Sequence, residues 1–225
     1  FNLPRFEKFI PGIEKGTYTI ITANSGVGKS KLTKLLFVLR ACKYIKDNPN
    51  CGIKIKIFYF CLEESRDIFM QSLISYELYK RHNIRVDVKK LSSLYKDDIL
   101  SQDILDKILD LKNYFKNLEE EFLSVFSMIR TPSHIYNTLK KYALNNGTIS
   151  NGIYTPNDEE LIIIPIIDHI SLIEPEKGQT LHQAMDTMSS RYFVELRNIY
   201  GMSPVVVQQQ SSEKEKKVYT LSGSS

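Results

Sequence analysis

The sequence has 225 residues, long enough for one sizeable hydrophobic core, and nothing in it suggests two full domains. Its formal net charge of +4 permits a polyanionic partner without requiring one, and its apolar and charged fractions are those of soluble globular proteins. No apolar run reaches the length of a membrane span, no signal peptide pattern is present, and the three cysteines lack metal-type spacing, so we expect a cytoplasmic protein in a reducing compartment.

The first predicted strand leads into a loop with two glycines. Residues 1–15 contain two prolines and end in a turn, which predicts a lead-in segment. The β-type run at residues 17–22 predicts the strand, and leucines at helical spacing predict a helix that begins near Lys31 and stops before Asn48. The stretch between them fits the phosphate-binding pattern G-x-x-x-x-G-K-S/T at every position but the first. Its residues are Ala23, Asn24, Ser25, Gly26, Val27, Gly28, Lys29 and Ser30.

The spacing of this loop suits the binding of phosphate groups. Glycines let successive backbone N–H groups point inward at an anion, and the following helix adds its positive N-terminal end. Lys29 would then reach the β- and γ-phosphates of a nucleotide, and the Ser30 hydroxyl would take one place on Mg²⁺. Ala23 should still allow the turn, at a cost if its φ angle is positive. The alternative is a chance glycine-rich turn, which would not need the flanking strand and helix.

Two carboxylates follow the second predicted strand. Residues 53–60 are β-branched and aromatic, which predicts a strand, and a helix to about Lys80 is predicted after Ser65. Open parallel sheets bind their ligands at the carboxyl ends of strands, so Glu63 or Glu64 could orient or deprotonate a water beside the γ-phosphate. Both could equally be helix N-terminal acids that the helix dipole favours. The residues alone leave this choice open.

The middle of the chain predicts mainly helices. Apolar residues at helical intervals over 97–120 predict a long amphipathic helix on the surface. A strand over 122–129 and a helix over 132–144 follow, with Ser133 as the expected N-cap of that helix. Residues 145–160 are rich in Asn, Gly and Asp, which predicts a loop.

A further acid ends an almost continuous apolar run. Residues 161–168 predict a strand buried on both faces, which would carry Asp168 to the ligand-binding edge of the sheet. There Asp168 could hold the water shell of Mg²⁺, although an Asp can also simply end a strand. Pro165 lacks an N–H, so we expect a bulge, a missing ladder bond or pairing that begins after it. We expect His169 to be structural, because no cysteine or second histidine lies at metal-ligand spacing.

The last part of the chain predicts a polar loop at 174–180, a helix over 181–200 that Gly201 stops, and a buried strand from Pro204. A glutamine at the end of this strand could sense the γ-phosphate and relay its presence. Three follow in a row, which leaves the choice open among Gln208, Gln209 and Gln210. The polar residues 211–225 form either a flexible charged loop or a DNA-contacting one, with Lys214, Lys216 and Lys217 as the contacting side chains.

Together these segments resemble RecA-like ATPases, above all the hexameric replicative helicases of the DnaB type and the bacteriophage primase-helicase type. The resemblance runs from Gly16 to about Gln210. The phosphate loop discriminates little, because many NTPases have it. More specific are Leu-Glu-Glu-Ser at 62–65 and Asp-His-Ile-Ser at 168–171, which look like the bacteriophage versions. The resemblance implies an α/β fold with a mainly parallel sheet flanked by helices on both faces, as a RecA-like domain over 16–225 that is incomplete at its C-terminus.

The resemblance also implies roles for individual residues, with ATP and Mg²⁺ as cofactors. The residues concerned are Lys29 for phosphate, Ser30 and Asp168 for the metal, Glu63 as the water-activating base, and Gln210 as the polar sensor with Gln209 as second choice. Such helicases supply an arginine finger across a subunit interface, and no arginine of this chain can be assigned that role.

In such helicases two loops that face a central channel hold single-stranded DNA, mostly through its phosphates. Their counterparts here would be residues 174–180, with Lys177, and residues 211–218. The implied partners are single-stranded DNA, further copies of the chain in a hexamer with nucleotide at its interfaces, and a primase.

The first function expected is therefore the ATP-driven motor domain of a hexameric DNA helicase, bacteriophage-encoded and acting in the host cytoplasm. One alternative is a RecA- or KaiC-like ATPase that assembles on DNA or protein without unwinding. Another is a nucleotide-binding regulatory or structural protein with little turnover, which Ala23, Pro165 and the lack of an assignable arginine finger would favour.

Overall fold

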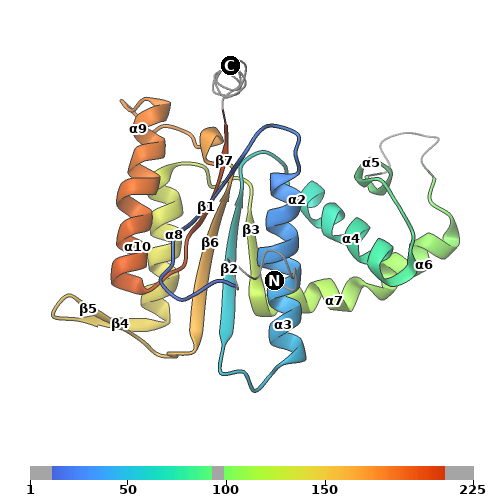
Figure 1. Ribbon diagram of the computed structural model, residues 1–225, viewed down its shortest axis with the longest axis horizontal. Coiled ribbons are helices and arrows are strands. Elements are labelled where there is room, and N and C mark those ends of the chain that lie inside the picture. Colours follow the sequence, from blue (N-terminus) through green and yellow to red (C-terminus); the bar gives the residue numbers. More distant parts are fainter. Residues whose placement is uncertain (1–11, 93–98, 211–225) are drawn as a thin grey trace, which may run out of the picture.

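The framework of the fold is a five-stranded sheet in which every pair of neighbours is parallel. The computed structural model describes residues 12–92 and 99–210 (Figure 1). The sheet has the order β1-β7-β6-β2-β3. Its strands are β1 (Thr19–Ala23), β2 (Lys54–Cys61), β3 (Leu123–Phe126), β6 (Leu161–Asp168) and β7 (Val205–Gln209). Because all five run the same way, their carboxyl ends meet at one edge, where open parallel sheets bind ligands.

Helices cover both faces of this sheet (Figure 1). On one side of the sheet are α2 (Lys29–Thr33), the π-helical η1 (Lys34–Arg40), α3 (Ala41–Asp47), α4 (Arg66–His82), α7 (Lys112–Asn117) and the π-helical η2 (Leu118–Phe122). On the same side, α5 (Val88–Leu91) and α6 (Gln102–Asp110) lie farther out, next to α4. The other face carries α8 (Pro132–Asn145), α9 (Leu181–Asp186), the π-helical η4 (Thr187–Tyr192) and α10 (Phe193–Tyr200). The α/β fold with a parallel sheet between two helical layers is thus confirmed.

The alternation of side chains along the strands divides the interior into two cores. In β2, Ile57 and Tyr59 belong to the core under the helix that begins at Lys29, whereas Phe58 and Phe60 belong to the core under α8 and α10. Successive residues of a strand point to opposite faces, so a strand buried on both faces must be apolar throughout. This explains why the apolar runs of β2 and β6 are almost continuous.

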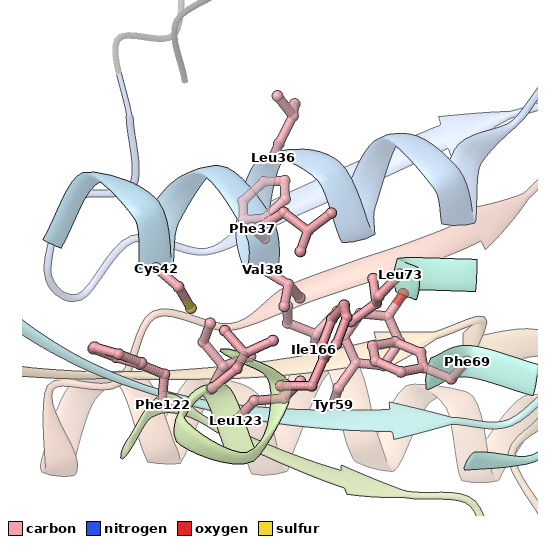
Figure 2. Packing of buried hydrophobic residues seen from close by; sticks show 14 of the residues in the cluster. Leu36, Phe37, Val38, Cys42, Tyr59, Phe69, Leu73, Phe122, Leu123 and Ile166 are labelled. Carbon is pink, nitrogen blue, oxygen red and sulfur yellow. The ribbon is translucent and has the colours of Figure 1, made fainter. Parts of the chain in front are cut away.

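Figure 2 shows the core beneath the helix formed by α2, η1 and α3. Val38 and Cys42 point from this helix toward Ile166 of β6 and Leu123 of β3. Val38 is fully buried, and burying such a side chain stabilises a fold by about 1.5–3 kcal/mol. The packing fixes the helix over the centre of the sheet, which in turn fixes the helix start at the ligand-binding edge.

Pro165 lies inside β6 without breaking its pairing. The register with β2 continues through Pro165, whereas the pairing with β7 begins one residue later, at Ile166 opposite Val205. The Ser203 N–H donates to the Ile163 carbonyl at 2.9 Å, so Ile163 directs its backbone polar groups away from β2. Pro165 has the same parity, and its missing N–H therefore removes no bond to β2. Of the three expected arrangements, pairing that begins after the proline is found on the β7 side, whereas the pairing with β2 runs through Pro165.

The loop predicted over 145–160 is wrong, because this segment contains a β-hairpin. Strand β4 (Gly147–Ser150) pairs antiparallel with β5 (Ile153–Pro156). Asn151 and Gly152 connect them with φ angles of 53° and 77°, as in the two-residue turns that favour Asn-Gly. The dipeptide was a sequence signal for the hairpin. The hairpin projects from the edge of the sheet opposite the carboxyl ends of the strands (Figure 1).

The single amphipathic surface helix predicted over 97–120 is interrupted in the structure. Within the described residues it is divided into α6, α7 and η2, with Leu111 in a turn between the first two. Its apolar face packs inward, as expected of an amphipathic helix, with Leu111, Phe115 and Leu118 buried in the core beneath the helix formed by α2, η1 and α3, called the loop helix from here on. The helical periodicity was correct, but it does not reveal what covers the apolar face.

The helix predicted over 181–200 is confirmed as the uninterrupted series α9, η4 and α10. It ends at Gly201, whose φ angle of 65° is the left-handed conformation that glycine adopts easily. Within residues 12–92 and 99–210, no helix combines the length and the hydropathy needed to cross a membrane.

Candidate active site

The loop between β1 and α2 has the backbone that its glycines predict. Gly26 and Gly28 have φ angles of 75° and 90°, which residues with side chains rarely adopt. Gly28 occupies the N-cap position, and the helix begins at Lys29. Ala23, by contrast, is the last residue of β1 and has no positive φ angle, so the cost foreseen for alanine does not arise.

The Lys29 ammonium lies over the loop that precedes it. The residue is only 9% exposed, and its Nζ donates to the carbonyl oxygens of Ala23 at 2.8 Å and Asn24 at 2.5 Å. The Asn24 Oδ1 is buried without a hydrogen-bond partner in the described part of the chain. The cation is thus held where the loop would receive an anion, and a phosphate would compete with these two carbonyls for its hydrogen bonds.

Asp168 is a buried carboxylate with a donor on each oxygen. Its Oδ1 accepts from the Ser30 hydroxyl at 3.0 Å, and its Oδ2 accepts from the Tyr59 hydroxyl at 2.6 Å. Burial is the main cause that raises the pKa of Tyr59 well above its usual value, and Asp168 adds to it, so the hydroxyl keeps its proton and remains a donor. Asp168 and Ser30, from distant parts of the sequence, meet as the sequence predicted.

Ser30 and Asp168 form a donor set that fits Mg²⁺. Both offer oxygen atoms, and Mg²⁺ is usually held by one or two protein oxygens together with phosphates and waters. Among the described residues, no group of three or more His, Cys, Asp or Glu side chains is placed to hold a metal ion.

The two glutamates after β2 have different surroundings. Glu64 is ion-paired with the buried Lys34, and the Cys61 thiol lies 3.5 Å from the same carboxylate oxygen. Glu63 has a side chain that is 61% exposed, and its Oε2 lies 3.9 Å from His169 Nε2. Neither is inside helix α4, which Ser65 caps by accepting a hydrogen bond from the Ile68 N–H. Glu63 is therefore the carboxylate that faces solvent beside the end of β6.

His169 follows Asp168 and is buried. Its Nδ1 has no hydrogen-bond partner within the described ranges, and its Nε2 faces Glu63. The prediction that His169 is not a metal ligand stays a prediction.

The three glutamines come at the end of β7, beside the phosphate loop. Gln208 and Gln209 pair with Thr22 and Ala23 of β1. The Gln210 backbone N–H donates to the Ala23 carbonyl at 3.1 Å, and its side-chain Nε2 lies 3.5 Å from the Thr22 hydroxyl. Gln210 is exposed and adjoins the first residue of the loop, which suits a polar sensor.

The polar segment 174–180 is anchored to the turn between β3 and α8. The Glu174 N–H donates to the Arg130 carbonyl at 3.0 Å, and the Glu174 carboxylate lies 2.8 Å from Arg130 Nε. The Ser133 N–H donates to Glu176 Oε1 at 2.7 Å, a bond that lowers the pKa of Glu176. Lys177 is exposed on this segment. Lys214, Lys216 and Lys217 lie outside the described residues.

The predicted N-cap of α8 was Ser133, and this prediction is wrong. Thr131 occupies the N-cap position, and Pro132 is the first residue of the helix. Ser133 is one position further in, where its N–H is among the donors left free at a helix start. The Glu176 carboxylate accepts from it, so a side chain from another segment satisfies this donor instead of a local cap.

Two residues of the site were missed in the sequence, Tyr59 and Lys34. Tyr59 is two positions before the end of β2, on the face that carries the loop helix, which was the available signal. Lys34 is one helical turn after Ser30, so the two share a helix face, and a lysine amid leucines could have drawn notice.

No family model and no curated protein matches the sequence. Solved structures do match the fold. A DnaB-like replicative helicase, described with its interactions with primase, superposes with a TM-score of 0.64 at 14% identity over 95% of this chain and 43% of its own. A second solved structure, described as an ATPase domain, gives 0.61 at 15% identity over 90% of this chain and 61% of its own. The chain thus spans less than two thirds of either structure and shares the RecA-like fold of helicase ATPase domains.

Proposed function

We propose that the chain is the ATP-hydrolysing motor domain of a hexameric replicative DNA helicase that translocates on single-stranded DNA and unwinds duplex. One observation carries this proposal. Ser30 of the loop helix and Asp168 of β6, 138 positions apart, are joined by a 3.0 Å hydrogen bond next to Lys29. This is the pair of groups that phosphate-loop NTPases use to hold a metal-bound nucleotide, and it occurs here in a fold shared with helicase ATPase domains.

The loop residues 23–30 bind the triphosphate of ATP in this proposal. Backbone N–H groups and the N-terminal end of the helix face the phosphates, and Lys29 exchanges its two carbonyl partners for β- and γ-phosphate oxygens. Ser30 would hold Mg²⁺ directly, and Asp168 would hold it through its water shell. When bound, Mg²⁺ would neutralise charge that develops on the phosphates.

Glu63 accepts the proton of the attacking water, because it is the carboxylate beside the end of β6 that forms no ion pair with a lysine among the described residues. Glu64 already forms an ion pair with Lys34, which supports assigning the base to Glu63. Gln210 senses the γ-phosphate from its place next to the loop and passes the signal to the residues after β7.

Single-stranded DNA and further copies of the chain are the proposed partners. Lys177 and the lysines at 214, 216 and 217 contact DNA phosphates inside a ring, with ATP at the interfaces between subunits. One similar structure is described with primase, which makes a primase a proposed partner here as well. We propose a cytoplasmic location, in the host of a bacteriophage.

The test is ATPase and strand-displacement activity of the full-length protein. ATP turnover should rise with single-stranded DNA and disappear in Lys29→Ala. Glu63→Gln should keep ATP binding but lose turnover by ~10²-fold or more, the usual contribution of a general base. The matched control is Glu121→Gln. Glu121 is an exposed glutamate of η2, which precedes β3 and therefore lies at the end of the sheet away from the phosphate loop.

Three outcomes separate the possible functions. Lack of ATP binding, or turnover that survives Lys29→Ala, would refute an ATPase at this site. DNA-stimulated turnover without strand displacement would instead support the RecA- or KaiC-like alternative. Binding without turnover would support a regulatory protein, although neither Ala23 nor Pro165 distorts the structure in the way that would favour this.

A further inference from the structure

We propose that Lys34 is a positioning residue, which clamps the turn carrying Glu63 to the phosphate-loop helix. This inference rests on the proposed function, since it concerns the placement of the proposed base. Lys34 would not touch substrate. It would act through Glu64, the neighbour of Glu63, and so determine which of the two carboxylates faces the nucleotide.

Lys34 is a buried cation that meets two polar groups and one aromatic ring. It is 5% exposed, and its ammonium is ion-paired with Glu64, donates to Ser72 Oγ at 2.9 Å, and lies 4.7 Å from the centre of the Phe69 ring. All three partners belong to the turn after β2 or to α4, whereas Lys34 belongs to the loop helix. A methionine would fill such a place without desolvating a charge. The lysine therefore makes a specific connection that stability alone does not require.

The loop helix holds the ends of two neighbouring strands through one face. Ser30 and Lys34 are four residues apart, so they lie one above the other on the helix. Ser30 donates to Asp168 at the end of β6, and Lys34 binds Glu64 just after β2. Cys61 and Asp168 are paired in the register of these two strands. The proposed metal-binding and base-bearing segments are thus both tied to the helix that starts at the phosphate loop.

The clamp separates the roles of two adjacent carboxylates. With Glu64 held against Lys34, the Glu63 side chain is left exposed beside His169. Without Lys34, Glu64 would be an unpaired carboxylate that favours solvent, and the turn would lose its tie to the loop helix. Glu63 would then sample positions away from the nucleotide, and a displacement of about 1 Å at a reacting group can cost on the order of 10²-fold in rate.

The experiment compares Lys34→Met with Lys43→Met in the full-length protein. Lys43 is on the same continuous helix and is ion-paired with Asp47, but this pair is exposed, so the control removes a lysine and an ion pair of equal type far from the site. Lys34→Met should lower kcat by on the order of 10- to 10²-fold and leave the Kd for a non-hydrolysable ATP analogue unchanged. Lys34→Arg, which keeps the charge, should recover part of kcat.

A second readout does not depend on turnover. Amide hydrogen exchange at residues 62–65 should be faster in Lys34→Met than in Lys43→Met or the wild type, because the turn has lost its tie. If Lys34→Met does not fold, Glu64→Gln, which weakens the same pair from the other side, should show the same acceleration together with a lower kcat.

The outcomes distinguish this inference from the proposed function. Wild-type exchange at 62–65 in the Lys34→Met or Glu64→Gln protein overturns the clamp, whatever the ATPase activity is. Wild-type kcat in an ATPase whose turn has been loosened overturns the positioning role. A wild-type protein without turnover would refute the proposed function, and the exchange experiment would still decide whether Lys34 fixes the turn.

Discussion

The hydroxyl of Tyr59 offers a direct test of how the carboxylate of Asp168 is held. It donates at 2.6 Å to Asp168 Oδ2 in a fully buried position, and Tyr59→Phe removes this hydrogen bond while keeping the ring. Asp168 would retain the Ser30 hydroxyl on its other oxygen. The substitution thus leaves one oxygen of a buried carboxylate without its donor.

The size of the effect follows from the charge of the acceptor. A hydrogen bond to a charged group contributes about 1.5–3 kcal/mol to the free energy of unfolding. At ~2–4 °C per kcal/mol for a chain of this length, the Tm of Tyr59→Phe should fall by about 3–12 °C. Nucleotide affinity in the presence of Mg²⁺ should fall as well, because Asp168 is less fixed.

The pH dependence of this difference has a defined sign. Burial raises the pKa of Tyr59 in the folded protein, so the folded state keeps the proton at pH values where an unfolded tyrosine loses it. The stability that the protonated hydroxyl contributes is present below the unfolded pKa of about 10 and is lost as the pH rises further. The wild type should therefore lose its advantage over Tyr59→Phe above about pH 10.

Tyr18→Phe is the matched control. The Tyr18 hydroxyl is also buried, but it has no hydrogen-bond partner among the described residues. Removing an unpaired buried hydroxyl should leave Tm unchanged or raise it slightly. Thermal unfolding followed by circular dichroism measures both variants. Equal losses of Tm in the two, or no loss in Tyr59→Phe, would refute the reasoning.

Three further expectations concern other parts of the molecule. Gly147→Ala should lower the free energy of unfolding, measured by urea titration, by about 1–3 kcal/mol. The reason is that a Cβ at this position would lie 2.6 Å from a backbone oxygen of the facing hairpin strand. Gly12→Ala is the control, because its Cβ would meet nothing within 4 Å, and similar losses in both variants would contradict the prediction. Burial, with Glu64 as a second cause, raises the pKa of the Cys61 thiol, which makes it less reactive near neutral pH. Mass spectrometry after a brief maleimide pulse near neutral pH should therefore find Cys51, which is only partly buried, modified first. Rapid labelling of Cys61 would contradict this. Lys177→Ala should reduce the salt slope of single-stranded DNA binding by about 1, as expected for one phosphate contact, and an unchanged slope would exclude that contact.

Elements with a continuous or clearly periodic pattern of apolar residues were predicted well. The continuous apolar run at 161–168 became β6 with the same bounds, and the helix over 181–200 ended at Gly201 as expected. Both predictions rest on local rules, namely the burial of parallel strands and the left-handed conformation of glycine. The hairpin at β4 and β5 was missed because its polar composition outweighed a two-residue turn signal at Asn151.

For the site, the sequence predicted that the phosphate loop and Asp168 would meet, and the Ser30 hydroxyl does reach that carboxylate. The spacing of the glycines, Lys29 and Ser30 within residues 23–30 predicts the conformation of the loop. The end of an apolar strand predicts which residue lies at the ligand-binding edge of the sheet. The choice between Glu63 and Glu64 could not be made from their positions, because both follow the same strand. Their difference comes from Lys34, which contacts one and not the other.

The sequence by itself therefore determined the kinds of element, their order, and a loop able to hold phosphate, since these depend on residues close together in the chain. The tertiary structure alone decided that Tyr59 would hold Asp168 and that Lys34 would hold Glu64. Both contacts join segments that only the packing of the loop helix and the pairing of β2 with β6 bring within reach. Local sequence patterns determine the face of a helix or strand on which a side chain lies. Its contact partner on another element depends on how the layers of the fold pack together.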